Sequence, residues 1–330
     1  MTRKRDTGTV VEYDRVGGAD VLQVRPRPLV PPGPSEVTVE VITAGINHID
    51  SFIRAGIEPG WADDPWPRRS GSDFAGIVVA VGNGVRRFRR GSEVIGHVRE
   101  GAQATFLNVA ESALVSKPKD LAWESAGGLY LAGATALETL DELRIGADDV
   151  LVVSAAAGGV GSIEVQLARR RGATVIGTCG DRNFDYLRQL GIKPVRYGEG
   201  IAERIRAAAG GPVTAMIDNF GQDGRELADA LNLPPSRFRS SEDRRNTELR
   251  LLQEDEVSIE RGTLLLERLT ALVTTRAFTL LVSGFYPLGD VVEAYEDLAR
   301  LHSRGKVILG THPVTTVRTL RARDVFELAG

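Results

Sequence analysis

The most constraining feature of the sequence is an alternation of apolar, strand-like runs with amphipathic, helix-like stretches. Four such pairs follow one another between residues 149 and 232. They occupy, in order, residues 149–155, 161–172, 174–178, 183–191, 194–197, 201–210, 213–220 and 224–232. Repeated strand–helix units of this length predict an α/β fold with a parallel, doubly wound sheet and helices on both of its faces. The strands are apolar throughout, as expected when both faces of the sheet are covered.

The turn between the first strand and the first helix reads SAAAGGVG and spans residues 154–161. It departs from the dinucleotide-binding pattern G-x-G-x-x-G, because alanine stands at the first glycine position. The turn is nevertheless where that pattern is required, since it directs backbone amide groups and a helix N-terminus toward an anion. Alanine is tolerated at the first position if φ stays negative there. The alternative is a turn that only packs, but we predict a pyrophosphate-binding turn made of Ala156, Ala157, Gly158, Gly159, Val160 and Gly161.

The end of the second predicted strand bears on the choice of nucleotide. Enzymes that bind NAD commonly place a carboxylate there, about 20 residues after the glycine-rich turn. Here the strand ends at Thr178 and Gly180 without a carboxylate, and Arg182 follows. Arg182 and Tyr197 suit a 2′-phosphate, so we predict NADPH. Two alternatives remain open: Asp181 could point inward and favour NADH, or Arg182 could be a solvated residue at the start of a helix.

The N-terminal part of the chain has a different pattern. Short strand-like runs at 36–46, 74–82, 91–97 and 105–118 are separated by glycine-containing turns. Close spacing of this kind predicts a small β-barrel or sandwich. With 330 residues in all, the chain is expected to form two domains.

Composition excludes several classes of function. The formal net charge of −3 argues against a nucleic-acid binder, which would normally present a basic face. The single cysteine, Cys179, rules out an internal disulfide and a cysteine-based zinc site. No apolar run approaches the roughly 18 residues needed to cross a membrane, and no apolar run follows the basic start. A cytoplasmic protein is therefore expected.

Five stretches carry a resemblance to a known family. They are AGINHIDSFIRAG (44–56), RSGSDFAGIVVAVGNGVRRFRRGSEVIG (69–96), LAGATALETL (131–140), VSAAAGGVGSIEVQLARRRGATVIGT (153–178) and YEDLARLHSRGKVIL (295–309). In this order they resemble the medium-chain dehydrogenase/reductase superfamily, and within it the zinc-free quinone oxidoreductase, or zeta-crystallin-like, branch. The resemblance implies a GroES-like, β-rich catalytic domain formed by residues 1–124 and 276–330. It also implies a Rossmann NADPH-binding domain over residues 125–275, and a homodimer.

The resemblance also implies roles for individual residues. Asn47 matches the asparagine of the family's N-x-x-D segment, and Thr135 the threonine of its G-x-T-A turn. Asn219 and Phe220 belong to the D-x-x-G segment after the fourth strand, whose backbone lies near the ribose and nicotinamide. Tyr197 matches a tyrosine near the 2′-phosphate. Alternatively, Asp50 could simply cap the helix that follows it, and Thr135 could bond to its own helix backbone.

No metal is expected from this comparison. Zinc-binding relatives use a cysteine where this chain has Asn47 and His48, and they carry a lobe of four close cysteines that is absent here. Stabilisation of a growing negative charge on a carbonyl oxygen therefore falls to amide or hydroxyl donors. Our candidates are Asn47, Tyr130 and Thr135.

Two features depart from the family pattern. Phe52 and Glu58 stand where quinone-reducing members often carry tyrosines, and the stretch 237–243 is more polar than the strand usually found there. We predict a zinc-independent oxidoreductase that transfers hydride from NADPH to a quinone or an α,β-unsaturated carbonyl compound. The alternatives are a non-catalytic NADPH-binding relative, or an enoyl reductase or tailoring enzyme of a biosynthetic pathway.

Overall fold

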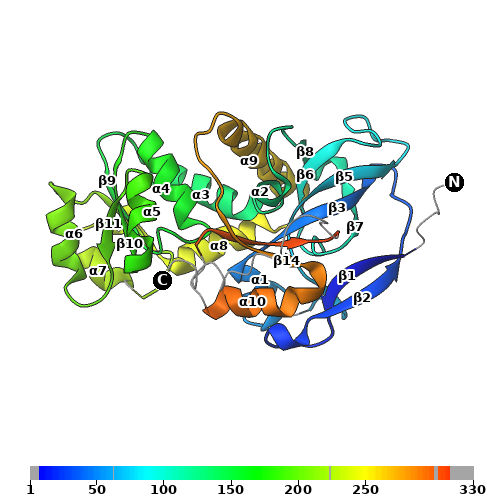
Figure 1. Cartoon of the computed structure of the whole chain (residues 1–330), viewed down its shortest axis with the longest axis horizontal. Helices are drawn as coiled ribbons and strands as arrows, with labels where there is room; N and C mark the ends of the chain where they lie inside the picture. Colours follow the sequence, from blue (N-terminus) through cyan, green and yellow to red (C-terminus); the bar gives the residue numbers. More distant parts are fainter. Residues whose placement is uncertain (1–6, 62, 223, 301–303, 313–330) are drawn as a thin grey trace.

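The computed structural model describes residues 7–61, 63–222, 224–300 and 304–312. A parallel sheet with its helices lies at one end of the molecule and the β-rich part lies at the other (Figure 1). Between them run helices α3 (Tyr130–Glu142) and α9 (Glu256–Thr274). The α/β fold class predicted from the sequence is confirmed. Among the described residues, no helix is both long and apolar enough to cross a membrane.

The parallel sheet has five strands in the order β11-β10-β9-β12-β13. The strands are β9 (Val150–Val153), β10 (Thr174–Cys179), β11 (Lys193–Arg196), β12 (Ala215–Ile217) and β13 (Phe238–Arg239). Four helices connect them, namely α4 (Gly161–Arg170), α5 (Phe184–Gln189), α6 (Ile201–Ala209) and α7 (Gly224–Ala230). Leu151 and Val153 pack into one core cluster and Val152, between them, into another. Successive side chains point to opposite faces of a strand, so both faces of the sheet are covered.

The sheet ends where the sequence looked unusually polar. Its order corresponds to the first five strands of a Rossmann sheet, and among the described residues no sixth strand follows β13. Helix α8 (Ser241–Leu251) begins there instead, with Ser240 as its N-cap accepting a hydrogen bond from the Asp243 amide. The family strand expected over 237–243 is thus reduced to two residues, because a capped, charged segment forms a helix.

The β-rich part contains two sheets. A three-stranded sheet joins β1 (Thr7–Tyr13), β2 (Gln23–Pro28) and β4 (Arg68–Arg69). The larger, seven-stranded sheet has the order β14-β15-β3-β5-β6-β8, with β7 paired to β3. Its strands are β3 (Glu36–Ile46), β5 (Asp73–Val81), β6 (Glu93–His97), β7 (Phe106–Ala110), β8 (Leu114–Ser116), β14 (Val282–Pro287) and β15 (Lys306–Gly310).

The C-terminal strands complete a sheet that the N-terminal region begins. Strand β15 pairs antiparallel with β3, placing Val307 opposite Ile46, and β14 runs parallel to β15. Helix α10 (Val291–Arg300) packs on β14 and β15, and α1 (His48–Arg54) lies against α10. From β14 to β15 the chain runs through a strand, a helix and a second strand. The two strands bring Lys306 beside Asn47, at the start of α1.

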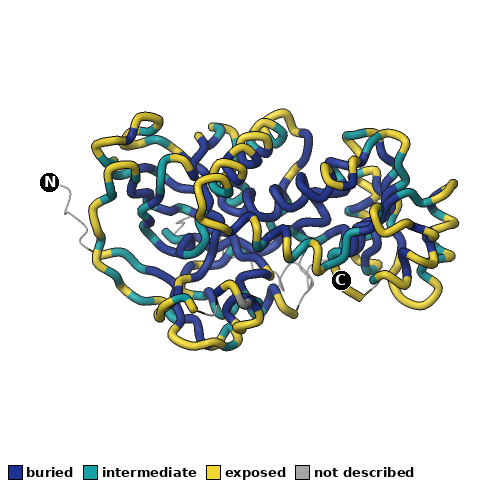
Figure 2. The backbone as a smooth tube through the Cα atoms, turned by 180° about the vertical axis from the view of Figure 1, so that it is seen from behind, coloured by how far each residue is buried: buried dark blue, intermediate teal, exposed yellow. Residues whose placement is uncertain are grey.

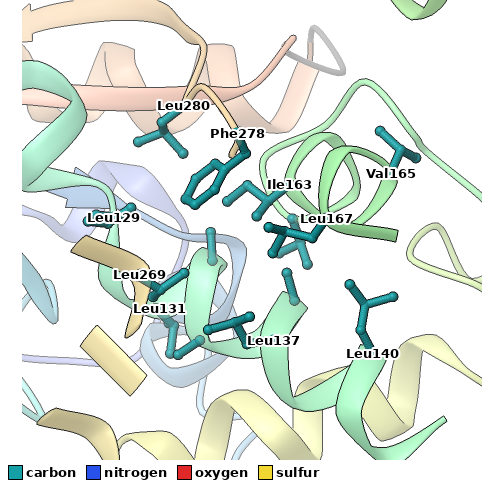
Figure 3. Packing of buried hydrophobic residues seen from close by; sticks show 14 of the residues in the cluster. Leu129, Leu131, Leu137, Leu140, Ile163, Val165, Leu167, Leu269, Phe278 and Leu280 are labelled. Carbon is teal, nitrogen blue, oxygen red and sulfur yellow. The ribbon is translucent and has the colours of Figure 1, made fainter. Parts of the chain in front are cut away.

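Helix α3 lies at the centre of the largest core cluster. It follows the short helix α2 (Trp123–Gly127), and its residues from Tyr130 to Leu140 are all buried. Its leucines pack against Ile163 and Leu167 of α4, Leu269 of α9 and Phe278 (Figure 3). The tube coloured by burial shows a continuous buried band through the middle of the molecule (Figure 2). Helix α3 therefore joins the parallel sheet to the β-rich part by apolar packing.

Candidate active site

A cavity of about 350 Å³ lies between the parallel sheet and the seven-stranded sheet. Most residues predicted to bind the cofactor line it: Ala157, Gly158, Gly159, Val160, Gly161, Thr178, Gly180, Arg182, Tyr197, Asn219 and Phe220. Its opposite end is formed by Ile46, Asn47, His48, Phe52, Arg244, Glu248 and Lys306. One cavity thus joins the predicted nucleotide end to the first turn of α1.

The turn at the nucleotide end is shaped by small residues. The left-handed residue is Ala155, with φ of 47°, one position before the expected first glycine. A Cβ on Gly161 would lie 2.5 Å from the carbonyl oxygen of Ala155, so a side chain there would collide with backbone. The turn thus keeps a tight cradle at the start of α4, where the first amide groups of a helix have no intrahelical partner. This geometry fits the pyrophosphate of a dinucleotide.

Ala156 does not reach the cavity. Its amide donates to the Thr178 carbonyl at 3.1 Å, and its methyl group faces Gly177 on the neighbouring strand. Of the six predicted turn residues, Ala156 is the one that does not line the cavity, and its methyl group packs against β10.

The acidic residue beside the second strand points away from the cavity. The Asp181 side chain is 65% exposed and forms an ion pair of 3.5 Å with Arg196. Arg182 and Tyr197 line the cavity instead, and the Tyr197 hydroxyl is the nearest atom to a Cβ built on Gly180. The geometry favours a phosphate over a ribose hydroxyl at this position.

The loop after β12 is held by one buried carboxylate. Asp218 accepts hydrogen bonds from the Ser154 hydroxyl at 2.7 Å and from the amides of Phe220 and Gly221 at 3.0 and 2.9 Å. These bonds place Asn219 and Phe220 at the cavity wall. The Asn219 side chain donates to Glu164 of α4 at 2.5 Å, and burial raises the pKa of that carboxyl to about 7.

At the other end, Asn47 belongs to a buried polar cluster. Its side-chain amide donates to Asp73 at 3.2 Å, and its side-chain oxygen accepts a hydrogen bond from the Lys306 ammonium. Lys306 also donates to the Ile46 carbonyl at 2.9 Å and lies 3.9 Å from Asp73. Burial lowers the pKa of Lys306 and raises that of Asp73, while the attraction between the two opposes both shifts. The cluster fixes the rotamer of Asn47 and leaves the second N–H of its amide for another acceptor.

Asp50 caps helix α1. Its carboxylate accepts hydrogen bonds from the backbone amide of Asn47 at 2.9 Å and from the Tyr295 hydroxyl at 2.8 Å. The capping role left open by the sequence is therefore what the structure shows. Burial raises the pKa of Asp50 to about 6, and these hydrogen bonds oppose the shift.

Two predicted hydroxyl donors are not brought to the cavity. The Tyr130 ring stacks on His97 with centroids 4.1 Å apart, and its hydroxyl donates to the Leu251 carbonyl at 2.9 Å. The Thr135 hydroxyl is buried and donates to the Leu131 carbonyl of its own helix at 2.7 Å. Both groups serve helix packing, so of the three candidates only Asn47 lines the cavity.

Sequence reasoning assigned no role to Asp73, Lys306, Arg244 or Glu248. Asp73 and Lys306 stand within stretches already singled out, but their meeting depends on β15 pairing with β3. Arg244 and Glu248 come from α8, which the sequence analysis did not recognise as a helix. The serine at 240 followed by an aspartate three residues later was the available signal.

No group of three or more histidine, cysteine or acidic residues within the described ranges could hold a metal ion. The His97 ring is buried and lies 3.1 Å from the Thr263 hydroxyl, and burial lowers its pKa to about 4. Cys179 lines the cavity, and burial raises the pKa of its thiol to about 12. That thiol is protonated at neutral pH and is a poor nucleophile.

Comparison with known proteins gives the family. Residues 33–130 match the model of the alcohol dehydrogenase GroES-like domain. Quinone oxidoreductase 1 of Escherichia coli (strain K12) is 30% identical over 91% of this chain and 99% of its own length. The chain belongs to the quinone oxidoreductase family. This assignment confirms the predicted medium-chain dehydrogenase/reductase membership and the predicted enzyme class, an oxidoreductase.

One further relative and one solved structure are also similar to this quinone oxidoreductase. The NADPH-dependent alkenal/one oxidoreductase of Arabidopsis thaliana chloroplasts is 35% identical over 54% of this chain and 49% of its own. The crystal structure of Escherichia coli quinone oxidoreductase complexed with NADPH superposes with a TM-score of 0.78 at 26% identity. That superposition covers 92% of this chain and 99% of the other.

Proposed function

We propose that this quinone oxidoreductase transfers hydride from NADPH to a quinone or to the β-carbon of an α,β-unsaturated carbonyl compound. The observation that carries the proposal is the single cavity that runs from the glycine-rich turn to Asn47 and Phe52. A dinucleotide seated on the turn would direct its nicotinamide along this cavity toward Asn47. The named activities of the two curated relatives support the same chemistry.

The chain's own residues would bind and orient both reactants. The turn 157–161 holds the pyrophosphate, Arg182 and Tyr197 hold the 2′-phosphate, and Asn219 and Phe220 lie beside the ribose and nicotinamide. When bound, NADPH supplies the hydride, and one proton from solvent completes reduction to a hydroquinone or a saturated carbonyl compound. The second N–H of the Asn47 amide donates to the acceptor's carbonyl oxygen, where negative charge grows during transfer. The apolar ring of Phe52 packs against the acceptor.

Several broader features complete the proposal. The reaction needs no zinc, because Asn47 and His48 stand where zinc-binding relatives use a cysteine, and no group of three or more histidine, cysteine or acidic residues among the described residues could hold a metal ion. Residues 1–124 with 276–330 form the catalytic domain, and residues 125–275 the nucleotide-binding domain. The protein is a cytoplasmic homodimer.

The test is a cofactor titration followed by an acceptor panel. We expect NADPH to bind more tightly than NADH, and 9,10-phenanthrenequinone or 3-penten-2-one to drive its oxidation at 340 nm. Dialysis against a chelator should leave the rate unchanged. NADPH binding without turnover of any quinone or enone would instead support the non-catalytic alternative.

A variant links the activity to this cavity. Asn47→Ala removes the donor to the acceptor oxygen, and we expect kcat/KM to fall by about 10- to 100-fold. The Kd for NADPH should stay within about threefold of the wild type. Thr135→Val is the matched control, because that hydroxyl bonds only to its own helix, and it should retain activity.

A further inference from the structure

Helix α8 lies against α1 at the acceptor end of the cavity. Arg244 and Glu248, one helical turn apart, line the cavity, while Arg245 lies over the Phe52 ring at 5.6 Å. Positions four apart share one face of a helix. The face of α8 that carries Arg244 and Glu248 is therefore directed toward the space that the acceptor would occupy.

Arg244 is poorly matched within the chain. Its side chain is only 15% exposed, and its closest acidic contact is Glu248, with Nη1 and Oε1 3.7 Å apart. This separation exceeds a hydrogen bond. Among the described residues, the buried Nε of Arg244 has no hydrogen-bond partner. Burying a guanidinium without such partners is costly.

Arg250, on the same helix, is better satisfied. Arg250 donates to Glu142 and to the Thr247 hydroxyl, both at 3.1 Å, and its side chain is 52% exposed. Arg245 lies 3.4 Å from the buried Glu58, an ion pair without a hydrogen bond. Among the described residues, Arg244 thus differs from Arg250 in that its guanidinium donates no hydrogen bond, and it is the arginine of α8 that lines the cavity.

The acidic neighbour of Arg244 is itself buried. Glu248 is buried, and burial raises the pKa of its carboxyl, although Arg244 and Lys306 oppose the shift. A carboxylate entering the cavity would compete with Glu248 for the guanidinium. Arginine presents a planar fork that matches a carboxylate through two parallel hydrogen bonds.

We propose that Arg244 binds an anionic group of the acceptor, and that the preferred acceptors are enones or quinones carrying a carboxylate close to the reducible bond. This inference rests on the proposed function, because it names the substrate class of the same cavity. The cofactor's phosphates would lie at the other end, on the turn 157–161 and Arg182. The arginine on α8 therefore has no cofactor phosphate to bind.

The test compares an anionic acceptor with its neutral twin. 3-Benzoylacrylate and its methyl ester share one enone, but only the acid carries a charge. The ester is the more electrophilic of the two, so each variant is compared with wild type on the same acceptor. We expect Arg244→Gln to lower kcat/KM for the acid by about 10- to 100-fold. The ester should change by less than about threefold. Arg250→Gln removes the same charge from the same helix outside the cavity and should leave both values unchanged.

A binding measurement separates this inference from the proposed function. The saturated analogue 3-benzoylpropionate cannot be reduced, so its Kd for the NADP⁺-loaded protein, measured by calorimetry, needs no turnover. We expect Arg244→Gln to weaken binding of 3-benzoylpropionate about 10-fold or more and Arg244→Lys to weaken it less. Glu248→Gln should strengthen the binding. Thermal unfolding of each variant checks that the fold is retained.

Three results would overturn the inference. One is equal losses for acid and ester, and another is unchanged binding of 3-benzoylpropionate by Arg244→Gln. The third is weaker binding of NADPH by Arg244→Gln, which would make Arg244 a cofactor contact. If no acceptor is turned over but the saturated acid still binds through Arg244, the proposed function fails while the anion site stands.

Discussion

The two ends of the cavity are built in different ways. The nucleotide end consists mainly of backbone and small residues from the stretches 155–161 and 178–182, with Tyr197, Asn219 and Phe220 beside them. The acceptor end is lined by side chains from α1 and its N-cap, α8 and β15, and the hydrogen bond between Asn47 and Lys306 joins residues 259 positions apart. The nucleotide end is built within the parallel sheet, whereas the acceptor end exists only when β15 has paired with β3.

The two ends also differ in charge. Asp73, Lys306 and Glu248 are all buried at the acceptor end, and Arg244 nearly so. Buried ionised groups need partners, so each depends on its neighbours. The nucleotide end depends instead on glycines, because their lack of a side chain lets the backbone of the turn pass close to its neighbours. Substitutions should therefore act at the two ends through different physical causes.

The largest effect is expected at the acceptor end, from Lys306→Met. Methionine preserves much of the side-chain volume but leaves the Asp73 carboxylate without its cationic neighbour. Removing one partner of a buried pair costs about 3–5 kcal/mol. Urea unfolding should show this loss, and kcat/KM should fall with it because the Asn47 oxygen loses its donor.

The control is the double variant Lys306→Met with Asp73→Asn. It removes the unpaired charge, so part of the lost unfolding free energy should return. If Lys306→Met alone proved as stable as wild type, the buried pair of Lys306 and Asp73 would not contribute to the free energy of unfolding as proposed.

At the nucleotide end, Gly161→Ala tests space rather than charge. The added methyl group would meet the Ala155 carbonyl oxygen at 2.5 Å, and backbone cannot move aside as a flexible side chain can. We expect a loss of about 3 kcal/mol in stability and a marked loss of NADPH binding, measured by fluorescence titration. Gly211→Ala is the matched control, because a Cβ there has no atom within 4 Å. Unimpaired NADPH binding by Gly161→Ala would contradict the assigned cradle.

Glu164→Gln tests how the buried carboxyl group that accepts a hydrogen bond from Asn219 makes stability depend on pH. In the folded protein, burial raises the pKa of the Glu164 carboxyl from its ordinary value of 4.5 to about 7. Ionisation therefore costs the folded state stability as the pH rises from about 4.5 to 7, and this cost persists above pH 7. The variant should be more stable than wild type by about 3 kcal/mol at pH 8, with the difference shrinking toward pH 5. A difference independent of pH, measured by urea unfolding, would refute this.

The smallest effect is expected from Arg182→Ala. Loss of one charged contact to the 2′-phosphate should weaken NADPH binding about tenfold, or about 1.4 kcal/mol, with little change for NADH. Arg188→Ala is a suitable control, since its exposed side chain pairs with Asp185 on α5. An unaltered preference for NADPH would remove Arg182 from the cofactor site.

This contrast also explains what the sequence could predict. The parallel sheet and the glycine-rich turn follow from local periodicity, and the family resemblance supplied the β-rich part. Helix α8 was missed because its segment shows almost no apolar face, although Ser240 and Asp243 form a recognisable cap. Tyr130 and Thr135 were placed in the site by analogy, and only packing could show that their hydroxyls point to backbone carbonyls.

Lys306 also spans the two ends. Its aliphatic chain would lie 3.2 Å from a Cβ on Gly159, its ammonium binds Asn47, and the preceding Gly305 donates its amide to the Ala157 carbonyl at 2.8 Å. Lys306 thus contacts both the turn and the residue that faces the acceptor. If binding of NADPH at the turn changes the affinity for the acceptor through this contact, the acceptor must change the affinity for NADPH by the same factor.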